Sequence, residues 1–251
     1  MVSAPKTSEQ LEKEKRAVAQ AALRYIRDGM LLGLGSGSTA NYFVGLLAKL
    51  VAGRKIKIEA VASSLHTAAR AKELGIPICE PRRGVRVDLT VDGADEIAPD
   101  LSLIKGAGGA LLREKVVARA SRHFLIIADS SKRVAQLGRS AVPVEVTPFA
   151  VPWVMDEVAK VGGNPVLRME KSKPDRAFLT DQQNYLLDCD FGLITDAQAL
   201  AARLKEISGV VEHGLFLGLA EAALVADGDK IIVLRPGSTP APLSQYDLAF
   251  E

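Results

Sequence analysis

Two aspartates follow a predicted buried strand near the middle of the chain. Residues 87–91 are mostly apolar and β-branched, which is typical of a strand buried in a sheet. Asp92 and Asp95 come directly after this segment, and the small residues Gly93 and Ala94 separate them. Small residues let a ligand approach the backbone closely, and carboxylates placed there can hold hydroxyl groups and move protons. The pattern favours acid–base chemistry on a polyol.

A lysine and a third acid flank the glycine-rich segment that follows. Lys105 precedes the sequence Gly-Ala-Gly-Gly-Ala at residues 106–110, and Glu114 falls in the first turn of a helix predicted from Leu111 onward. The lysine ammonium could donate to a sugar oxygen or to a developing oxyanion. The positive end of the helix dipole should keep the Glu114 carboxylate ionised near neutral pH, as a proton acceptor requires.

Other interpretations of these acids stay open. Asp92 and Asp95 could join Glu96 and Asp100 on Mg²⁺ or Ca²⁺, although the spacing of a calcium loop is absent. Alternatively, Asp95 could do no more than cap the next element, and Glu114 could be an ordinary first-turn glutamate. The three histidines are scattered and carry no motif, so histidine catalysis is not supported.

A candidate phosphate site lies nearer the N-terminus. Residues 30–34 predict a short buried strand, and a helix predicted over residues 41–51 begins directly after the turn 35–40. Backbone N–H groups and hydroxyls would converge there on the positive end of the helix dipole. The turn therefore predicts a site for a small terminal phosphate, made by Ser36, Gly37, Ser38 and Thr39. Pure N-capping of the helix by these hydroxyls is the alternative.

The same turn fits the two familiar nucleotide loops poorly. An ATP-type loop needs Gly-Lys-Ser/Thr, and residues 35–40 contain no lysine. The dinucleotide fingerprint fits only in its looser form, with Gly35 and Gly37 followed by Ala40. A nicotinamide dehydrogenase stays open as a rival, since Glu59 could hold a ribose hydroxyl.

The elements that must position these loops alternate between strands and helices. This alternation predicts an α/β fold with a Rossmann-like, mostly parallel sheet and helices on both faces. Loops that leave the carboxyl ends of such strands meet at one rim. A strand at 122–128 would bring Lys132 to that rim. There the lysine could bind an anionic group, or it could be an exposed loop residue. Further strands are predicted at 57–61, 76–79 and 231–234, and further helices at 9–27 and 64–74.

A change of pattern near residue 140 predicts a second, smaller domain. Residues 140–208 predict an α+β unit of ferredoxin-like kind, and residues 1–139 and 209–251 form the α/β catalytic domain. The small domain is expected to lie at an oligomer interface. Its predicted strands and helices cover residues 142–146, 151–161, 164–169, 185–189 and 196–207.

Composition excludes several classes of protein. The 251 residues are 48% hydrophobic and 25% charged, as in an ordinary globular protein. A net charge of +2 favours neither a nucleic-acid nor a membrane partner, and no apolar run approaches the roughly 20 residues that span a bilayer. The two cysteines, Cys79 and Cys189, have no metal or redox spacing, so we expect a cytoplasmic protein.

Four motifs, in this order, resemble ribose-5-phosphate isomerase of type A. The resemblance implies an aldose–ketose isomerase of the non-oxidative pentose phosphate pathway. Such an enzyme interconverts D-ribose 5-phosphate and D-ribulose 5-phosphate without a metal or organic cofactor, usually as a homodimer or homotetramer. The motifs are Gly-Ser-Gly-Ser-Thr-Ala at 35–40, Asp-Gly-Ala-Asp-Glu at 92–96, Lys-Gly-Ala-Gly-Gly-Ala at 105–110 with Arg-Glu-Lys at 113–115, and Ala-Asp-Ser-Ser-Lys at 128–132.

The resemblance also implies a role for each site residue. Glu114 would move a proton between C1 and C2 through a cis-enediol, while Asp92 and Lys105 assist ring opening and polarise the oxygens. Asp95 would hold hydroxyls. The expected phosphate ligands are Lys15, Ser36, Ser38, Thr39 and Lys132, and further substrate contacts are expected from Gly37, Gly93, Ala94, Gly106, Ala107 and Gly108. A non-catalytic sugar-phosphate sensor on the same fold is the alternative, although it would not need Glu114.

Overall fold

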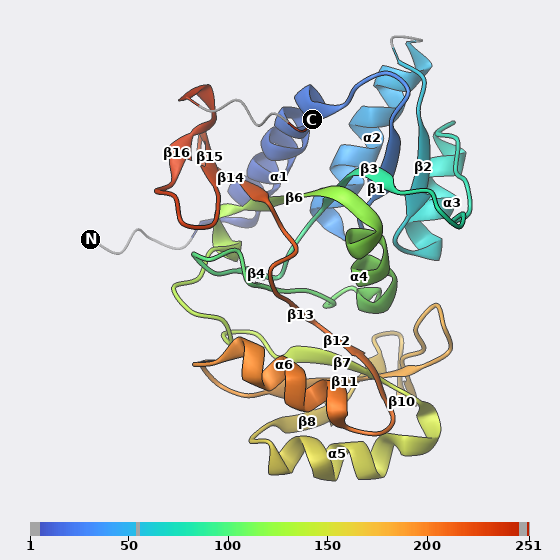
Figure 1. The fold of residues 1–251 in the computed structure, drawn as a ribbon, viewed down its shortest axis with the longest axis vertical. Coiled ribbons are helices and arrows are strands. Elements are labelled where there is room, and N and C mark those ends of the chain that lie inside the picture. The colour runs from blue at the N-terminus through green and yellow to red at the C-terminus, as the bar shows by residue number, and fades with distance from the viewer. Residues whose placement is uncertain (1–5, 54–55, 246–249, 251) are drawn as a thin grey trace.

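A seven-stranded sheet forms the centre of the larger part of the molecule in the computed structural model (Figure 1), which describes residues 6–53, 56–245 and 250. The strand order is β16-β15-β14-β6-β3-β1-β2. The strands from β14 to β2 run parallel, and β15 and β16 are antiparallel to their neighbours. The strands are β1 (Leu31–Leu34), β2 (Glu59–Ala62), β3 (Val87–Asp92), β6 (Ser121–Asp129), β14 (Ala222–Asp227), β15 (Lys230–Leu234) and β16 (Ala241–Pro242).

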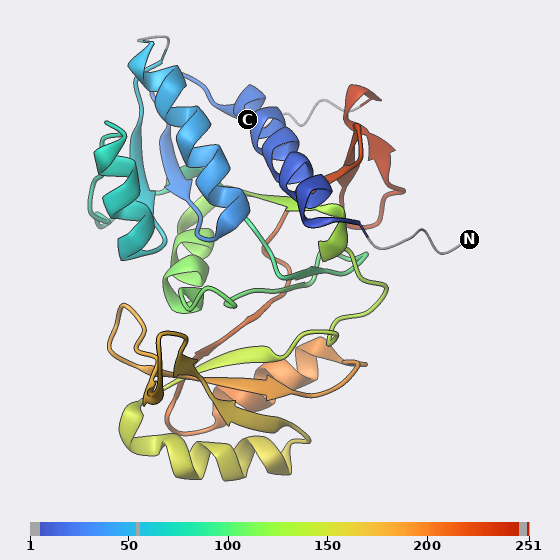
Figure 2. The same ribbon diagram turned by 180° about the vertical axis from the view of Figure 1, so that it is seen from behind.

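Helices cover both faces of this sheet, as the sequence predicted. Side chains alternate along β6, because successive residues of a strand point to opposite faces. Leu125 and Ile127 pack in the core beneath α1 (Ser8–Ala22), α2 (Ser38–Ala52) and α3 (Leu65–Glu73), which Figure 2 shows from behind. Phe124 and Ile126 pack on the opposite face, which is covered by α4 (Leu111–Ala120) and a small sheet of β4 (Glu96–Ile97), β5 (Leu103–Ile104) and β13 (Leu215–Phe216).

In the large sheet, one predicted strand is wrong and one strand was not predicted. Residues 76–79 form only an isolated parallel bridge between Ile78 and Ala60, because Pro77 has no N–H to donate to a ladder. The central strand β14 was missed. Its sequence Ala-Ala-Leu-Val-Ala-Asp is rich in alanine, which favours helices. Its burial between β6 and β15 outweighs that propensity.

The lower part of the molecule in Figure 1 is a four-stranded antiparallel sheet with two helices. Its strand order β12-β7-β11-β8 and its βαββαβ element order confirm the ferredoxin-like prediction. Strand β12 pairs with β7, so this sheet extends beyond residue 208, the predicted end of the small domain. The elements are β7 (Val142–Val146), α5 (Val151–Lys160), β8 (Asn164–Leu167), β11 (Tyr185–Asp190), α6 (Ala197–Glu206) and β12 (Val210–His213), with a hairpin of β9 (Met169–Glu170) and β10 (Lys173–Ala177).

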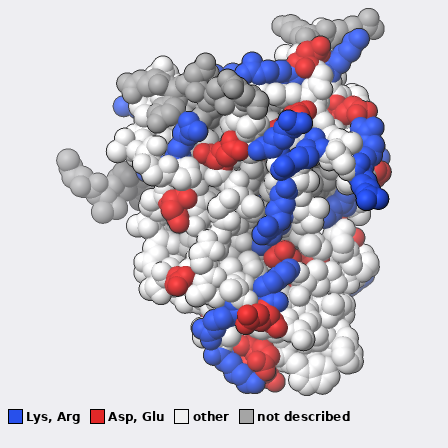
Figure 3. All heavy atoms as spheres, viewed as in Figure 1, with Lys and Arg blue, Asp and Glu red and all other residues white. Residues whose placement is uncertain are grey.

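The surface carries both signs of charge. Figure 3 shows Lys and Arg side chains in a band down the middle of one face, interrupted by acidic side chains. This mixture is consistent with the net charge of +2. Within the described ranges, every helix is too short or too polar to cross a bilayer.

Candidate active site

The loops after β1 and β3 meet the glycine-rich loop 105–109 and the start of α4 around a cavity of about 90 Å³. Because β1, β3 and β6 are parallel, their carboxyl ends lie at the same edge of the sheet. The cavity therefore joins the predicted acid site and the predicted phosphate site. Its lining residues are Ser36, Gly37, Ser38, Thr39, Gly93, Ala94, Asp95, Lys105, Gly106, Gly108, Glu114 and Lys132.

Lys105 is the centre of a buried charge cluster. Its Nζ lies 3.1 Å from Asp92 Oδ2 and 3.5 Å from Glu114 Oε1, and it donates a 2.6 Å hydrogen bond to the carbonyl oxygen of Gly93. All three charged side chains are at least 94% buried. Burial opposes the charge of Lys105, but attraction by Asp92 and Glu114 outweighs it and raises the ammonium pKa. The lysine therefore stays a fixed cation.

Asp92 is held rigidly beside this lysine. Its Oδ1 accepts hydrogen bonds from the N–H groups of Ser36 (3.0 Å) and Gly93 (2.7 Å). The β1 turn can approach only because residue 35 is glycine, since a Cβ there would lie 2.2 Å from Asp92 Oδ1. Asp92 does not itself line the cavity. It contacts Lys105 and joins two of the loops that do line the cavity.

Glu114 differs from its expected state. Burial raises its pKa to about 8, and the nearby Asp92 and Asp95 add to the effect while Lys105 opposes it. The expectation of ionisation near neutral pH was wrong, because burial outweighs the helix dipole. Its buried Oε2 has no hydrogen-bond partner within the part of the chain that the structure describes. A carboxyl oxygen without a donor, at the edge of a cavity, can accept a proton from a ligand.

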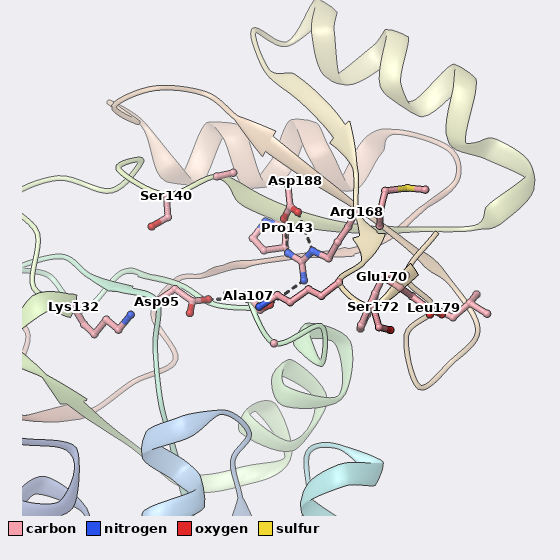
Figure 4. A pocket seen from close by; sticks show the side chains of 15 residues that line it. Asp95, Ala107, Lys132, Ser140, Pro143, Arg168, Glu170, Ser172, Leu179 and Asp188 are labelled. Carbon is pink, nitrogen blue, oxygen red and sulfur yellow. Dashed lines mark hydrogen bonds and ion pairs between the residues drawn. The ribbon is translucent and has the colours of Figure 1, made fainter. Parts of the chain in front are cut away.

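Asp95 lines the cavity and also braces its wall. Its Oδ2 accepts a 2.9 Å hydrogen bond from the N–H of Ala107 in the glycine-rich loop, as Figure 4 shows. The capping that the sequence allowed is therefore directed at the loop 105–109. Ala107 lines the adjoining larger cavity instead of the small one.

The start of α2 has the free donors that an anion needs. The N-cap residue is Gly37, with φ of +95°, and no side chain of a described residue caps the helix. Pure capping by the hydroxyls was therefore the wrong alternative, and the first N–H groups of α2 are left for a ligand. Ser38 and Thr39 both line the cavity. The Ser36 hydroxyl also lies 2.8 Å from Ser63 Oγ, and either of the two hydroxyls can be the donor in this contact.

The two lysines predicted to bind phosphate have different surroundings. Lys132 follows β6 in a short 3₁₀ helix (Ser130–Lys132) and lines the cavity. Lys15 does not line it and pairs with Glu12, with Nζ 2.8 Å from Oε1. The structure therefore brings Lys132 to the site and leaves Lys15 outside it.

Glu14, which the sequence motifs did not indicate, supports the loop that carries Lys132. Its Oε2 accepts hydrogen bonds from the N–H (2.9 Å) and hydroxyl (2.8 Å) of Ser130, and its side chain is 2% exposed. Its Oε1 accepts from the N–H of Gly228 and pairs with Lys6. The available signal was an acid on the apolar stripe of α1, four residues before the buried Val18.

A larger cavity of about 880 Å³ adjoins the small one and shares Asp95, Gly108 and Lys132 with it. The small domain provides most of its other lining residues, among them Arg168, which lies between β8 and β9 (Figure 4). The sequence predicted only oligomer contacts for this domain. No local motif marks Arg168, so its place beside the site follows from the tertiary structure.

The remaining acids of the predicted metal alternative bind the protein itself. Glu96 accepts hydrogen bonds from the N–H groups of Gly138 and Ser140, and Asp100 accepts from the N–H and hydroxyl of Ser102. Among residues 6–53, 56–245 and 250, no group of three or more His, Cys, Asp and Glu is arranged to hold a metal ion.

Comparison with known proteins gives a consistent result. The family described as ribose 5-phosphate isomerase A (phosphoriboisomerase A) matches residues 59–230. The chain is 49% identical over 223 residues to ribose-5-phosphate isomerase A of Roseiflexus castenholzii, covering 88% of this chain and 94% of the relative. It is 47% identical over 229 residues to that of Nitrobacter hamburgensis, covering 90% and 98%.

Solved structures agree with this result. Ribose 5-phosphate isomerase A from Methanocaldococcus jannaschii has a TM-score of 0.85 and 34% identity, covering 89% of this chain and 99% of that one. A D-ribose-5-phosphate isomerase solved in complex with phospho-erythronic acid has a TM-score of 0.86 and 34% identity, covering 90% and 99%.

Proposed function

The chain belongs to the ribose 5-phosphate isomerase A family, and we propose that it interconverts D-ribose 5-phosphate and D-ribulose 5-phosphate in the cavity beside Lys105. The observation that carries this proposal is the buried Glu114 Oε2 at the cavity edge, which has no hydrogen-bond partner among the described residues. The other oxygen of this carboxyl group, Oε1, lies 3.5 Å from the ammonium of Lys105. A base next to a fixed cation is what proton transfer α to a carbonyl requires.

The phosphate binds at the start of α2. The free N–H groups of its first turn, the hydroxyls of Ser38 and Thr39 and the ammonium of Lys132 supply the donors. Ser38→Ala and Lys132→Ala should therefore each raise KM about tenfold with little change in kcat, the cost of one charge-assisted hydrogen bond. Steady-state kinetics of both variants is the measurement, and an unchanged KM in both would place the phosphate elsewhere.

Glu114 transfers the proton. In the open-chain aldose, its carboxylate removes the proton from C2, and the electron pair forms the C1–C2 double bond while the C1 oxygen becomes negative. The same carboxyl then returns the proton to C1, and the hydroxyl proton of O2 passes to O1, which leaves the ketose. The fixed charge of Lys105 and the N–H of Gly108 stabilise the enediolate oxygen, because the N–H groups of Lys105, Ala107 and Gly109 already donate within the protein.

The two aspartates prepare the substrate. Asp92 holds Lys105 in place and, through it, assists ring opening and polarises the sugar oxygens. Asp95 lines the cavity and holds hydroxyls with the carboxylate oxygen that does not bind Ala107. No metal or organic cofactor is required on this proposal, because Lys105 supplies the positive charge between Asp92 and Glu114.

The direct test mixes EDTA-treated protein with ribose 5-phosphate and follows ribulose 5-phosphate without any added cofactor. Rapid conversion is expected. Absence of conversion, with sugar-phosphate binding still seen by calorimetry, would overturn the proposal in favour of the sensor. Phospho-erythronic acid, which a relative binds, should inhibit, because its carboxylate resembles the two oxygens of an enediolate.

Two further properties are part of the proposal. We expect a homodimer or homotetramer with the small domain in contact, supported by the exposed rings of Phe149 (83%) and Trp153 (60%), whose centroids are 5.4 Å apart. Light scattering of Trp153→Arg should then show dissociation. We also propose a cytoplasmic location, supported by the unpaired thiols Cys79 and Cys189.

A further inference from the structure

Arg168 of the small domain binds the backbone of the glycine-rich loop. Its Nη1 donates to the carbonyl oxygens of Gly106 (3.0 Å) and Ala107 (3.1 Å), two consecutive residues. Its Nε lies 2.9 Å from Asp188 Oδ2, and its Nη2 bonds the other oxygen of the same carboxylate. Figure 4 shows this arrangement between the two domains. The bidentate pair with Asp188 fixes the plane of the guanidinium.

The carbonyl of Gly106 also accepts the N–H of Gly109 at 2.9 Å, so the peptide that depends most on Arg168 is the next one, whose carbonyl belongs to Ala107. The direction of each carbonyl determines which way the next N–H group points. In a trans peptide, the carbonyl of one residue and the N–H of the next point in opposite directions, and the described chain has no cis peptide. The N–H groups of Ala107 and Gly108 therefore point away from Arg168. For Ala107, this direction agrees with the hydrogen bond that its N–H donates to Asp95. The N–H of Gly108 makes no hydrogen bond to any described residue, and Gly108 lines the small cavity.

The loop needs such support because its own backbone is permissive. Gly106 has φ of +105° and Gly109 has φ of +84°, conformations that glycine enters and leaves at little cost. A flip of the peptide between Ala107 and Gly108 would replace an N–H donor by a carbonyl oxygen. That oxygen would repel the negative charge that forms on the substrate.

We propose that Arg168 and Asp188 are a positioning pair that aims the Gly108 N–H at the enediolate oxygen. This inference rests on the proposed isomerase activity and gives the small domain a part in the active site. Lysine cannot replace Arg168, because one ammonium cannot bond two consecutive carbonyls and also pair with both carboxylate oxygens of Asp188.

The domains have other contacts, so loss of Arg168 should not separate them. Lys115 of α4 bonds Glu212 and the carbonyl of His213 in β12. Asp181 of the small domain accepts from the N–H of Leu65 in α3 at 2.7 Å. These contacts allow the loop to be tested in a folded protein.

The test compares Arg168→Met, Arg168→Lys and Asp188→Asn with a matched control, Arg176→Lys, which alters an arginine–glutamate pair of the same domain. We expect kcat to fall about 100-fold in Arg168→Met, the size of effect that misplacement of a catalytic group by 1 Å produces. Arg168→Lys and Asp188→Asn should show smaller losses, on the order of tenfold. The KM of these three variants for ribose 5-phosphate should be little changed. Both kcat and KM of the control variant Arg176→Lys should be close to those of the wild type.

A binding measurement separates positioning from a merely structural role. Calorimetry should show weaker binding of phospho-erythronic acid to Arg168→Lys and Asp188→Asn, with unchanged binding of inorganic phosphate, because only the acid reaches the loop. Equal loss for both ligands, or wild-type kcat in all three variants, would overturn the inference. An inactive wild-type enzyme would instead overturn the proposed isomerase function.

Discussion

Glu114 and Lys115 are neighbours in α4, and each enters a buried cluster of opposite charges. The Glu114 cluster contains Asp92, Lys105 and Glu114, and the Lys115 cluster contains Lys115, Glu212 and His213. Phe216 links them, because Lys105 Nζ lies 5.5 Å and Lys115 Nζ 4.8 Å from the centre of its ring. Each cluster also borders a cavity, of about 90 Å³ and 300 Å³ respectively.

The clusters differ in how completely their hydrogen bonds are satisfied. Lys115 Nζ donates to Glu212 Oε1 at 3.0 Å and to the carbonyl oxygen of His213 at 2.6 Å. Burial works against the charge of Glu212, but Lys115 and the N–H of His213 lower its pKa to about 2. Glu114 keeps one oxygen that no described residue hydrogen-bonds, and burial raises its pKa to about 8. Burial, charge and a nearby cavity are thus not enough to indicate a catalytic site. The Glu114 cluster differs by having a buried carboxyl oxygen that accepts no hydrogen bond from any described residue.

The largest expected effect is on catalysis by Glu114→Gln. Glutamine keeps the shape of the side chain and cannot accept the proton, so kcat should fall between about 10²- and 10⁴-fold. KM should change little, because the phosphate contacts remain. Stopped-assay kinetics measures both constants. If Glu114→Gln kept more than about a tenth of wild-type kcat, Glu114 would not be the base.

The pH dependence of the reaction is the second test. The base must be deprotonated, and burial raises the pKa of Glu114 to about 8. The value of kcat/KM should therefore rise about tenfold per pH unit below that value and level off above it. A profile already flat from pH 6 would contradict the raised pKa. Arg82→Lys, in an exposed ion pair, should give the wild-type profile.

Lys115→Met should affect stability and spare catalysis. It leaves Glu212 with fewer partners and a buried carbonyl of His213 without its donor, which costs about 1–3 kcal/mol. Urea unfolding measures this loss. Activity should stay within about threefold of wild type, because Lys115 supplies no group to the small cavity. A loss of kcat like that of Glu114→Gln would erase the distinction between the two clusters.

The smallest expected effect is on stability. The contributions of Glu114 and Glu212 to the free energy of unfolding should change in opposite directions with pH. The pKa of Glu114 is raised by folding, so its contribution to stability is present below about pH 4.5 and is lost as the pH rises through about 8. The pKa of Glu212 is lowered, so its contribution is present above about pH 4.5 and is lost as the pH falls through about 2.

Burial lowers the pKa of Lys115, the partner of Glu212, to about 8, so the comparison is made at pH 7, where this lysine is charged. Thermal melting at pH 7 should show Glu114→Gln above wild type and Glu212→Gln below it, by about 2–4 °C per kcal/mol. At pH 5 the Glu114→Gln variant should melt close to wild type, because this pH is near the ordinary glutamate pKa of 4.5 and little of the loss has yet occurred. Identical shifts for both variants at pH 7 would mean that the two clusters are equivalent.

The sequence by itself determined the parts that depend on local pattern. The β-branched segment before Asp92, the glycine-serine turn before α2 and the alternation of strands and helices placed these loops at one rim, because parallel strands end on the same side of a sheet. Small residues at 93, 94 and 106–109 indicated close approach of a ligand, and most of the predicted contacts line one cavity.

Only the tertiary structure decided the protonation and bonding of these groups. The pKa of Glu114 depends on burial beside Lys105, and the Ser36 hydroxyl turns to Ser63 across the chain. Arg168 reaches the loop at 106–107 from another domain. Such properties depend on neighbours distant in sequence, and the strength of an electrostatic interaction depends on how far its surroundings exclude water.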